Sequence, residues 1–116
     1  MQKKTIIFAF RGDPMCFVHV LLNGLDLASS GMEGKIIVEG DAVKLIPELA
    51  DSKHFLHQLY TRALEADLIV GACRACSTKL DVATAIEALG VELIGEMSGH
   101  PSMSKYMEQG YTIVTF

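Results

Sequence analysis

Short apolar runs alternate with helical stretches along the chain, and this alternation constrains the fold more than any other feature. The first run, TIIFAF at 5–10, is continuous, β-branched and aromatic, which is typical of a strand buried on both faces. Strands that alternate with helices form a parallel sheet with helices on its faces. The expected strands are 5–10, 34–40, 68–72, 91–97 and 111–116.

Residues that start and stop helices fall between these runs. Asp13 is a suitable N-cap, Pro14 suits the first helical position, and Gly31 is expected to end this helix. Further along, Thr78 with Asp81 three residues later is a variant of the capping box. It predicts the start of a helix that ends near residue 90, at a glycine.

Three further helical stretches complete the pattern. A short piece at 41–50 is expected to be broken by Pro47, because proline lacks an N–H and clashes with the preceding turn. The last helix is expected within 100–110. The remaining stretch, Ser52–Asp67, lies between these two and is expected to be a helix. Its predicted buried face consists of Phe55, Leu56, Leu59, Tyr60 and Leu64.

The length of the chain, 116 residues, is that of one domain, and no linker, repeat or low-complexity tract divides it. We therefore expect a single α/β domain over 1–116. Its architecture is expected to be a three-layer α/β/α sandwich around a mostly parallel, five-stranded sheet. The order of the strands in that sheet does not follow from the sequence.

Charge and hydropathy narrow the classes of partner. The net charge is −4, and the ten Lys and Arg residues are scattered, so nucleic-acid binding is not expected. No apolar segment reaches the roughly 18 residues of a membrane span, and the basic start lacks the apolar core of a signal peptide. A cytoplasmic location is therefore expected.

Hydrophobic residues make up 50% of the chain, which is more than so small an interior can bury. We expect part of this apolar surface to be buried between identical subunits. The chain is thus predicted to form a homo-oligomer.

The residues that follow the strands are the candidates for function. In open parallel sheets, ligands bind beyond the carboxyl ends of the strands, a boundary called the carboxyl edge below. The segments RGDPMC, EGDAV, CRACSTK and SGHPS follow the first four predicted strands. They bring to this edge Cys16, Cys73, Cys76, Asp13, Asp41, Arg11, Arg74, Lys79 and His100.

Cys73 and Cys76 form a C-x-x-C pair at the turn between a strand and a helix. Backbone N–H groups at a helix start and nearby cations, here Arg74 and Lys79, stabilise a thiolate. A stabilised thiolate can attack a disulfide or carry a persulfide. A single cysteine is more often a small buried hydrophobe, but a pair at this position favours reactivity.

A metal site is the less favoured interpretation of the same cysteines. Together with Cys16 and a histidine, His19 or His100, Cys73 and Cys76 can form a three-thiolate site. The spacing differs from common zinc motifs, which supply two pairs of ligands. Cys16 is better interpreted as a packed core residue, because its neighbours are apolar. No resident metal is therefore expected.

The other polar residues of the carboxyl edge each have two interpretations. His100 is either a proton shuttle for the thiols or a solvated loop residue. Asp41 either points into the crevice or caps a helix, as Asp13 does. Glycine-rich phosphate loops are missing, so neither a nucleotide nor any other cofactor is expected.

The order of these features resembles the DsrE/DsrF-like family of small α/β proteins. The resemblance rests on the first strand and its long apolar helix, on IIVEGDAVKLI, on IVGACRAC and on the last helix–strand unit. It implies a persulfide-carrying cysteine at the third strand, assembly into homotrimers or hexamers, and other sulfur-relay proteins as partners. Two cysteines, Cys73 and Cys76, match that position here, and Cys76 is preferred because it is nearer the predicted helix start.

The leading hypothesis is therefore a sulfur carrier, at most a sulfurtransferase-type enzyme. One alternative is a thiol-disulfide or peroxide-reactive oxidoreductase that uses the Cys73/Cys76 pair. The other is a subunit that binds a metal or small ligand without catalysis.

Overall fold

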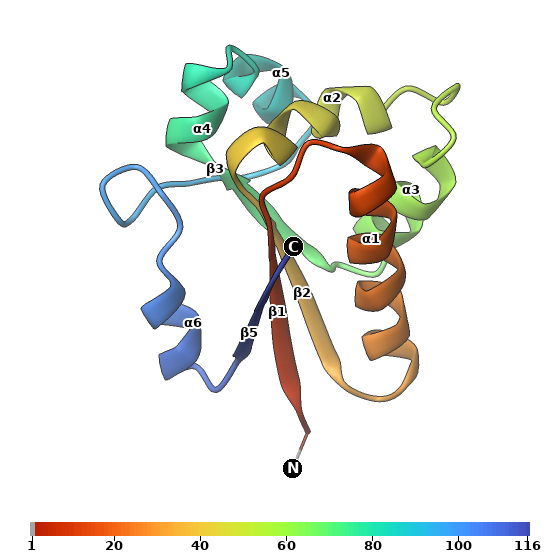
Figure 1. The fold of residues 1–116 in the computed structure, drawn as a ribbon, viewed down its shortest axis with the longest axis vertical. Coiled ribbons are helices and arrows are strands. Elements are labelled where there is room, and N and C mark those ends of the chain that lie inside the picture. The colour runs from red at the N-terminus through yellow and green to blue at the C-terminus, as the bar shows by residue number, and fades with distance from the viewer. Residues whose placement is uncertain (1) are drawn as a thin grey trace.

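A computed structural model describes residues 2–116 and shows five strands in one parallel sheet. The strand order is β4-β3-β2-β1-β5, and every neighbouring pair is parallel. This confirms the predicted α/β fold with helices on both faces of the sheet (Figure 1). The strands are β1 (Lys4–Ala9), β2 (Glu33–Val38), β3 (Ile69–Cys73), β4 (Leu93–Ile94) and β5 (Thr112–Thr115).

The helices connect successive strands, and most lie near their predicted positions. Asp13 caps α1 and Pro14 is its first residue, as predicted, while Gly31 follows its end with a φ of 79°. The helical elements are α1 (Pro14–Ser29), the 3₁₀ helix η1 (Gly40–Lys44), α2 (Leu45–Leu49), α3 (His57–Glu65), α4 (Arg74–Lys79), α5 (Ala83–Ala88) and α6 (Met103–Glu108).

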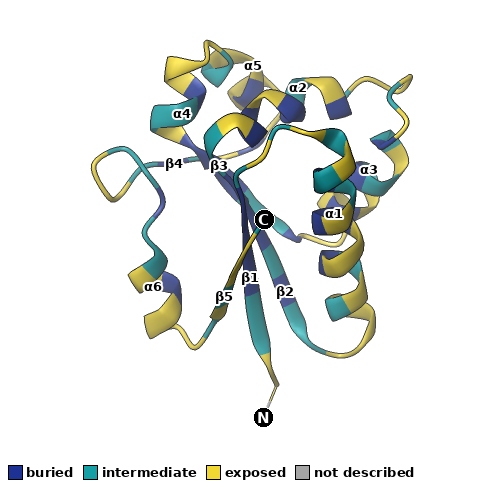
Figure 2. Cartoon of the chain, in the orientation of Figure 1, coloured by how far each residue is buried: buried dark blue, intermediate teal, exposed yellow. Residues whose placement is uncertain are grey.

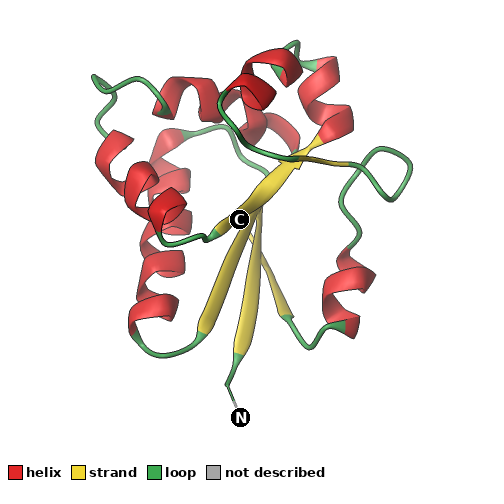
Figure 3. Cartoon of the chain, turned by 180° about the vertical axis from the view of Figure 1, so that it is seen from behind, coloured by secondary structure: helices red, strands yellow, loops and turns green. Residues whose placement is uncertain are grey.

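The two faces of the sheet are covered unequally. Along β1 the side chains alternate: Ile7 and Ala9 join the larger core under α1, α2, α3 and α5, whereas Ile6 and Phe8 join a smaller core under α6. In Figures 1 and 3, α6 lies alone on one side of the fan of strands. Figure 2 shows buried residues along β1, β2 and β3, whereas the edge strand β5 is mostly exposed.

The strand order explains this asymmetry. The chain adds β2, β3 and β4 in one direction across the sheet, and right-handed crossovers in one direction put their helices on one face. It then returns to the other side of β1 to add β5. This reversal puts the connecting helix α6 on the opposite face.

Two predictions between β2 and β3 were wrong in detail. Pro47 does not break the helical piece, because α2 begins at Leu45 and proline is tolerated in a first turn, where N–H groups lack helical partners. The next helix, α3, begins at His57 rather than Ser52. Of its predicted buried face, Leu56 and Tyr60 are buried, whereas Phe55 and Leu64 are exposed. Phe55 precedes the helix and stacks on the His54 ring, and Leu64 lies in the last turn of α3.

The helix expected from Thr78 to Gly90 is two helices. The first, α4, starts before Thr78, with Cys73 as its N-cap, so the Thr78–Asp81 pair does not open it. Asp81 has a φ of 61° and lies in the turn between α4 and α5. Gly90, with a φ of 81°, follows the end of α5, as predicted.

Among the described residues 2–116, no helix is long and apolar enough to cross a membrane.

Candidate functional site

The carboxyl edge has one switch point, between β3 and β4. The connection that leaves β3 runs through α4 and α5 over the larger core, whereas the connection that leaves β4 runs to α6 on the other face. Loops that diverge from neighbouring strands leave a crevice, where open α/β sheets bind their ligands. Cys73 ends β3, and His100 lies on the loop after β4, so both border this crevice.

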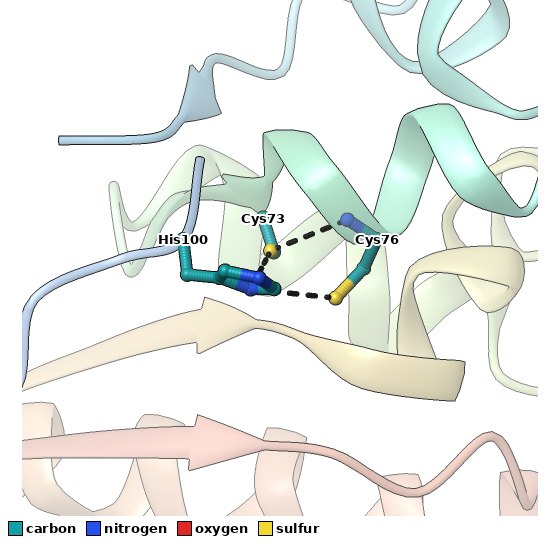
Figure 4. A group of neighbouring side chains, drawn as sticks. All are labelled: Cys73, Cys76 and His100. Atoms are coloured by element: carbon teal, nitrogen blue, oxygen red, sulfur yellow. Dashed lines mark hydrogen bonds between the residues drawn. The ribbon is translucent and has the colours of Figure 1, made fainter. Parts of the chain in front are cut away.

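Three side chains meet at this point: Cys73, Cys76 and His100 (Figure 4). The Nδ1 atom of His100 lies 3.2 Å from the Cys73 Sγ and 4.0 Å from the Cys76 Sγ. All three atoms lie within 4.8 Å of one another. The fold therefore brings the imidazole to two thiols that lie more than twenty residues before it in the sequence.

Cys73 is fully buried and serves as the N-cap of α4. Its Sγ accepts a hydrogen bond from the Cys76 N–H at 3.4 Å and lies 3.7 Å from the Gly99 carbonyl oxygen, to which the thiol donates. Burial raises the pKa of the Cys73 thiol to about 12, against the lowering effect of the Cys76 N–H, and the negative charge of Glu39 adds to the rise. This thiol is therefore neutral near pH 7.

Cys76 lies in the first turn of the same helix and is half-buried, so it is the more accessible of the two thiols. Its Sγ accepts a hydrogen bond from the Gly40 N–H at 3.3 Å. Gly40 has a φ of 57° and packs against the Phe10 carbonyl, a conformation that favours glycine. The turn after β2 is thus shaped to direct a backbone donor at the sulfur.

The loop that carries His100 is fastened to the start of α4. The Ala75 N–H donates to the Gly99 carbonyl at 2.8 Å, and Met97 and His100 exchange two backbone hydrogen bonds. These contacts hold the imidazole against the thiols. The His100 side chain is 41% exposed, so its outer edge reaches solvent.

Glu39 completes the surroundings of the cluster and was missed by the sequence interpretation. Its carboxylate lies 3.6 Å from the His100 Nδ1, and its side chain is 13% exposed. Burial raises the pKa of Glu39, although the adjacent His100 lowers it in part. Its position as the first residue after β2 was the available signal, but Asp41, two residues later, was selected instead.

The remaining predicted residues lie on or near the carboxyl edge but outside the cluster. Asp41 does not point into the crevice, because its carboxylate pairs with Lys44 at 2.7 Å and packs against Gly12. Asp13 is only the cap of α1, and its Oδ1 accepts the Met15 N–H.

The two predicted cations do not approach the thiols. The Arg74 guanidinium donates to the Leu93 carbonyl oxygen at 3.3 Å, and Lys79 is exposed at the far end of α4. Neither stabilises a Cys73 thiolate, and burial dominates at that residue. Cys16 is half-buried in α1 and is not part of the cluster, so the three-thiolate metal site is not formed.

The arrangement allows three kinds of chemistry. The accessible Cys76 thiol can attack a sulfur or disulfide electrophile, with His100 positioned to exchange its proton. The two thiols are close enough to form a disulfide after a small rotation of their side chains. Two sulfur atoms and one imidazole nitrogen are also the ligand types that thiophilic metals prefer.

Comparison with known proteins finds archaeal relatives. An uncharacterized protein of Methanocaldococcus jannaschii, MJ0733, is 33% identical over 97 residues, which are 84% of this chain and 77% of that protein. An uncharacterized protein of Archaeoglobus fulgidus is 39% identical over 59 residues, which are 47% of this chain and 97% of that protein. No protein-family model matches the chain, and no solved structure matches it significantly. The resemblance to the DsrE/DsrF-like family therefore stays a prediction.

Proposed function

The chain belongs to the same family as the Methanocaldococcus jannaschii protein MJ0733, and we propose that it is a persulfide carrier that loads sulfane sulfur on Cys76. The proposal rests on one observation, which is that the two thiols differ in their exposure to solvent. Cys76 is accessible and receives a backbone N–H, whereas Cys73 is fully buried behind it. One thiol is therefore suited to attack and the other to a later step.

Loading is a transfer of one sulfur atom between thiols. The Cys76 thiolate attacks the outer sulfur of a donor hydropersulfide, R–S–SH. A new sulfur–sulfur bond forms on Cys76, the sulfur–sulfur bond of the donor breaks, and R–S⁻ leaves with the electron pair of that bond. His100, whose Nδ1 lies 4.0 Å from the Cys76 Sγ, is positioned to take the thiol proton and return it to the leaving group.

Unloading has two routes. An acceptor thiolate of a partner sulfur-relay protein can attack the outer sulfur and leave Cys76 as a thiolate. Alternatively, His100, whose Nδ1 lies 3.2 Å from the Cys73 Sγ, takes the proton of this neutral thiol as its sulfur attacks the inner sulfur of the persulfide, which forms a Cys73–Cys76 disulfide and releases HS⁻. An external dithiol then reduces that disulfide. We place this chemistry in the cytoplasm, where thiol pools keep cysteines reduced.

The test is intact mass spectrometry of the reduced protein after incubation with inorganic polysulfide. We expect the mass of one or more sulfur atoms to be added, to be removed by dithiothreitol, and to map to Cys76. Cys76→Ser should abolish loading, whereas Cys73→Ser and the matched control Cys16→Ser should retain it. No added sulfur in the unsubstituted protein, or full loading of Cys76→Ser, would contradict the proposal.

A thiol-disulfide oxidoreductase is the second candidate, and the proximity of the two sulfur atoms favours it. In that case both Cys73→Ser and Cys76→Ser should abolish reduction of a model disulfide equally. Treated with a mild oxidant, the unsubstituted protein should lose two hydrogen atoms and gain no sulfur.

We also propose that the chain forms a homotrimer or hexamer. Large apolar side chains are exposed, among them Met15, Phe55 and Met107, and α6 alone covers one sheet face. Light scattering coupled to gel filtration tests this, and a monomeric mass at micromolar concentration would contradict it.

A further inference from the structure

The cluster of Cys73, Cys76 and His100 also has the geometry of a metal site. In a tetrahedral zinc site, with Zn–S of about 2.3 Å and Zn–N of about 2.0 Å, neighbouring ligand atoms lie roughly 3.5–3.8 Å apart. The two sulfur–nitrogen distances here, 3.2 and 4.0 Å, bracket this value. Small side-chain rotations would therefore place all three atoms around one ion.

The ligand positions are held by the fold rather than by flexible loops. Cys73 is at the end of a central strand, and Cys76 is in the first turn of α4. His100 is held by the hydrogen bond from Ala75 to Gly99 and by its bridge with Met97. Ligands held in this way lose little conformational freedom on binding an ion.

The surroundings also resemble those of metal ligands. The Gly40 N–H donates to the Cys76 Sγ, and such outer contacts orient ligands and tune the charge on sulfur. The Glu39 carboxylate lies 3.6 Å from the His100 Nδ1 and adds a carboxylate oxygen, a further metal-ligand type, next to the three proposed ligands. The Glu39 side chain is largely buried, and its contact with His100 is longer than a normal hydrogen bond.

We propose that Cys73, Cys76 and His100 bind a thiophilic divalent cation of the Zn²⁺ class. Two S–metal bonds and one N–metal bond form, and the two thiols release their protons to solvent. The ion occupies the Cys76 sulfur, so it blocks sulfur loading and regulates the site. This regulatory step rests on the proposed carrier function, whereas metal binding itself does not.

The test is titration of the reduced, metal-free protein with Co²⁺ under anaerobic conditions. We expect one equivalent to produce a thiolate-to-cobalt charge-transfer band and the visible bands of a tetrahedral site, and Zn²⁺ to abolish both. Cys73→Ser, Cys76→Ser and His100→Ala should each weaken binding at least roughly tenfold. Circular dichroism of each variant verifies that it is folded.

Cys16→Ser and His19→Ala are the matched controls, because neither residue belongs to the cluster. Both should bind Co²⁺ as the unsubstituted chain does. Absence of the charge-transfer band, or an equal loss of binding in either control, would overturn the metal site.

A second measurement separates this inference from the carrier function. Metal-free and Zn²⁺-loaded protein are each incubated with inorganic polysulfide and weighed by mass spectrometry. Sulfur uptake by the metal-free form alone supports both proposals, and equal uptake by the Zn²⁺-loaded form overturns the regulatory step. Metal binding without sulfur uptake in either form overturns the carrier function and leaves the metal site standing. Sulfur uptake by a protein that binds no metal supports the carrier function and overturns the metal site.

Discussion

Two strand-to-helix turns at the same edge of the sheet use different caps. After β1, the exposed Asp13 carboxylate accepts the Met15 N–H at 2.9 Å. After β3, the fully buried Cys73 thiol accepts the Cys76 N–H at 3.4 Å. Carboxylates and hydroxyls are the usual caps because their oxygen atoms accept stronger hydrogen bonds than sulfur does. The thiol at the second turn is therefore poorly explained by helix stability and better explained by its chemistry.

The surroundings of the two caps support this distinction. Asp13 is exposed and makes only the contacts of a cap. Cys73 faces a second thiol, an imidazole and, beyond it, a carboxylate. We therefore expect another capping residue to replace Asp13 at little cost in stability, and no other capping residue to replace Cys73 without loss. Four measurements test this difference, from the largest expected effect to the smallest.

Substitution of the two cap residues should lower the free energy of unfolding by very different amounts. Cys73→Asp would bury a carboxylate close to Glu39, so we expect a loss of about 3 kcal/mol or more in the free energy of unfolding. Asp13→Asn keeps an equivalent cap and should change stability by less than about 0.5 kcal/mol. Urea denaturation measures both. Equal stability of the two variants would show that the second turn is as permissive as the first.

Alkylation should distinguish the two thiols of the second turn. In the reduced, metal-free protein we expect iodoacetamide to modify Cys76 at least roughly tenfold faster than Cys73, because reaction at Cys73 requires local opening of a buried site. Peptide mapping by mass spectrometry at successive times gives the two rates. Faster labelling of Cys73 would invalidate the assignment of Cys76 as the carrier.

Deletion of the first cap should affect stability alone. Asp13→Ala removes the acceptor for the Met15 N–H and should cost about 1 kcal/mol of unfolding free energy. Because Asp13 lies outside the cluster, the alkylation rate of Cys76 should stay unchanged. A change in that rate would show that the first turn influences the reactivity of the second.

The free energy of unfolding should fall in alkali because the buried Cys73 thiol holds its proton only in the folded protein. The pKa of Cys73 is raised from an ordinary value of 9.0 to about 12, so the folded protein holds the proton that the unfolded chain releases. Its contribution is fully present below pH 9 and is lost as the pH rises from 9 towards 12. Tyr60 and Tyr111, whose pKa values are also raised to about 12, add to the decline in every variant.

The comparison that isolates the thiol is between the unsubstituted protein and Cys73→Ser, both reduced and metal-free. Over this pH window the serine variant should lose less stability, as measured by urea denaturation at fixed pH. If the free energy of unfolding falls equally with pH in the two proteins, folding does not raise the pKa of Cys73.

Local patterns predicted much of the fold because they act over a few residues. The β-branched run at 5–10 includes all of β1 except its first residue, and Asp13 and Pro14 mark the start of α1. One prediction was wrong where two local signals competed. The Thr78–Asp81 pair suggested a helix start, but a cap at Cys73 had already begun α4.

The sequence by itself determined a parallel sheet, its carboxyl edge and the C-x-x-C pair upon it, because periodicity, caps and spacing are local properties. Only the tertiary structure decided which groups meet. The order β4-β3-β2-β1-β5 places the switch point between β3 and β4, and strand order depends on long-range packing. That order brings His100 and Glu39 to the thiols, and it leaves Cys16, Asp41 and Arg74 outside the cluster.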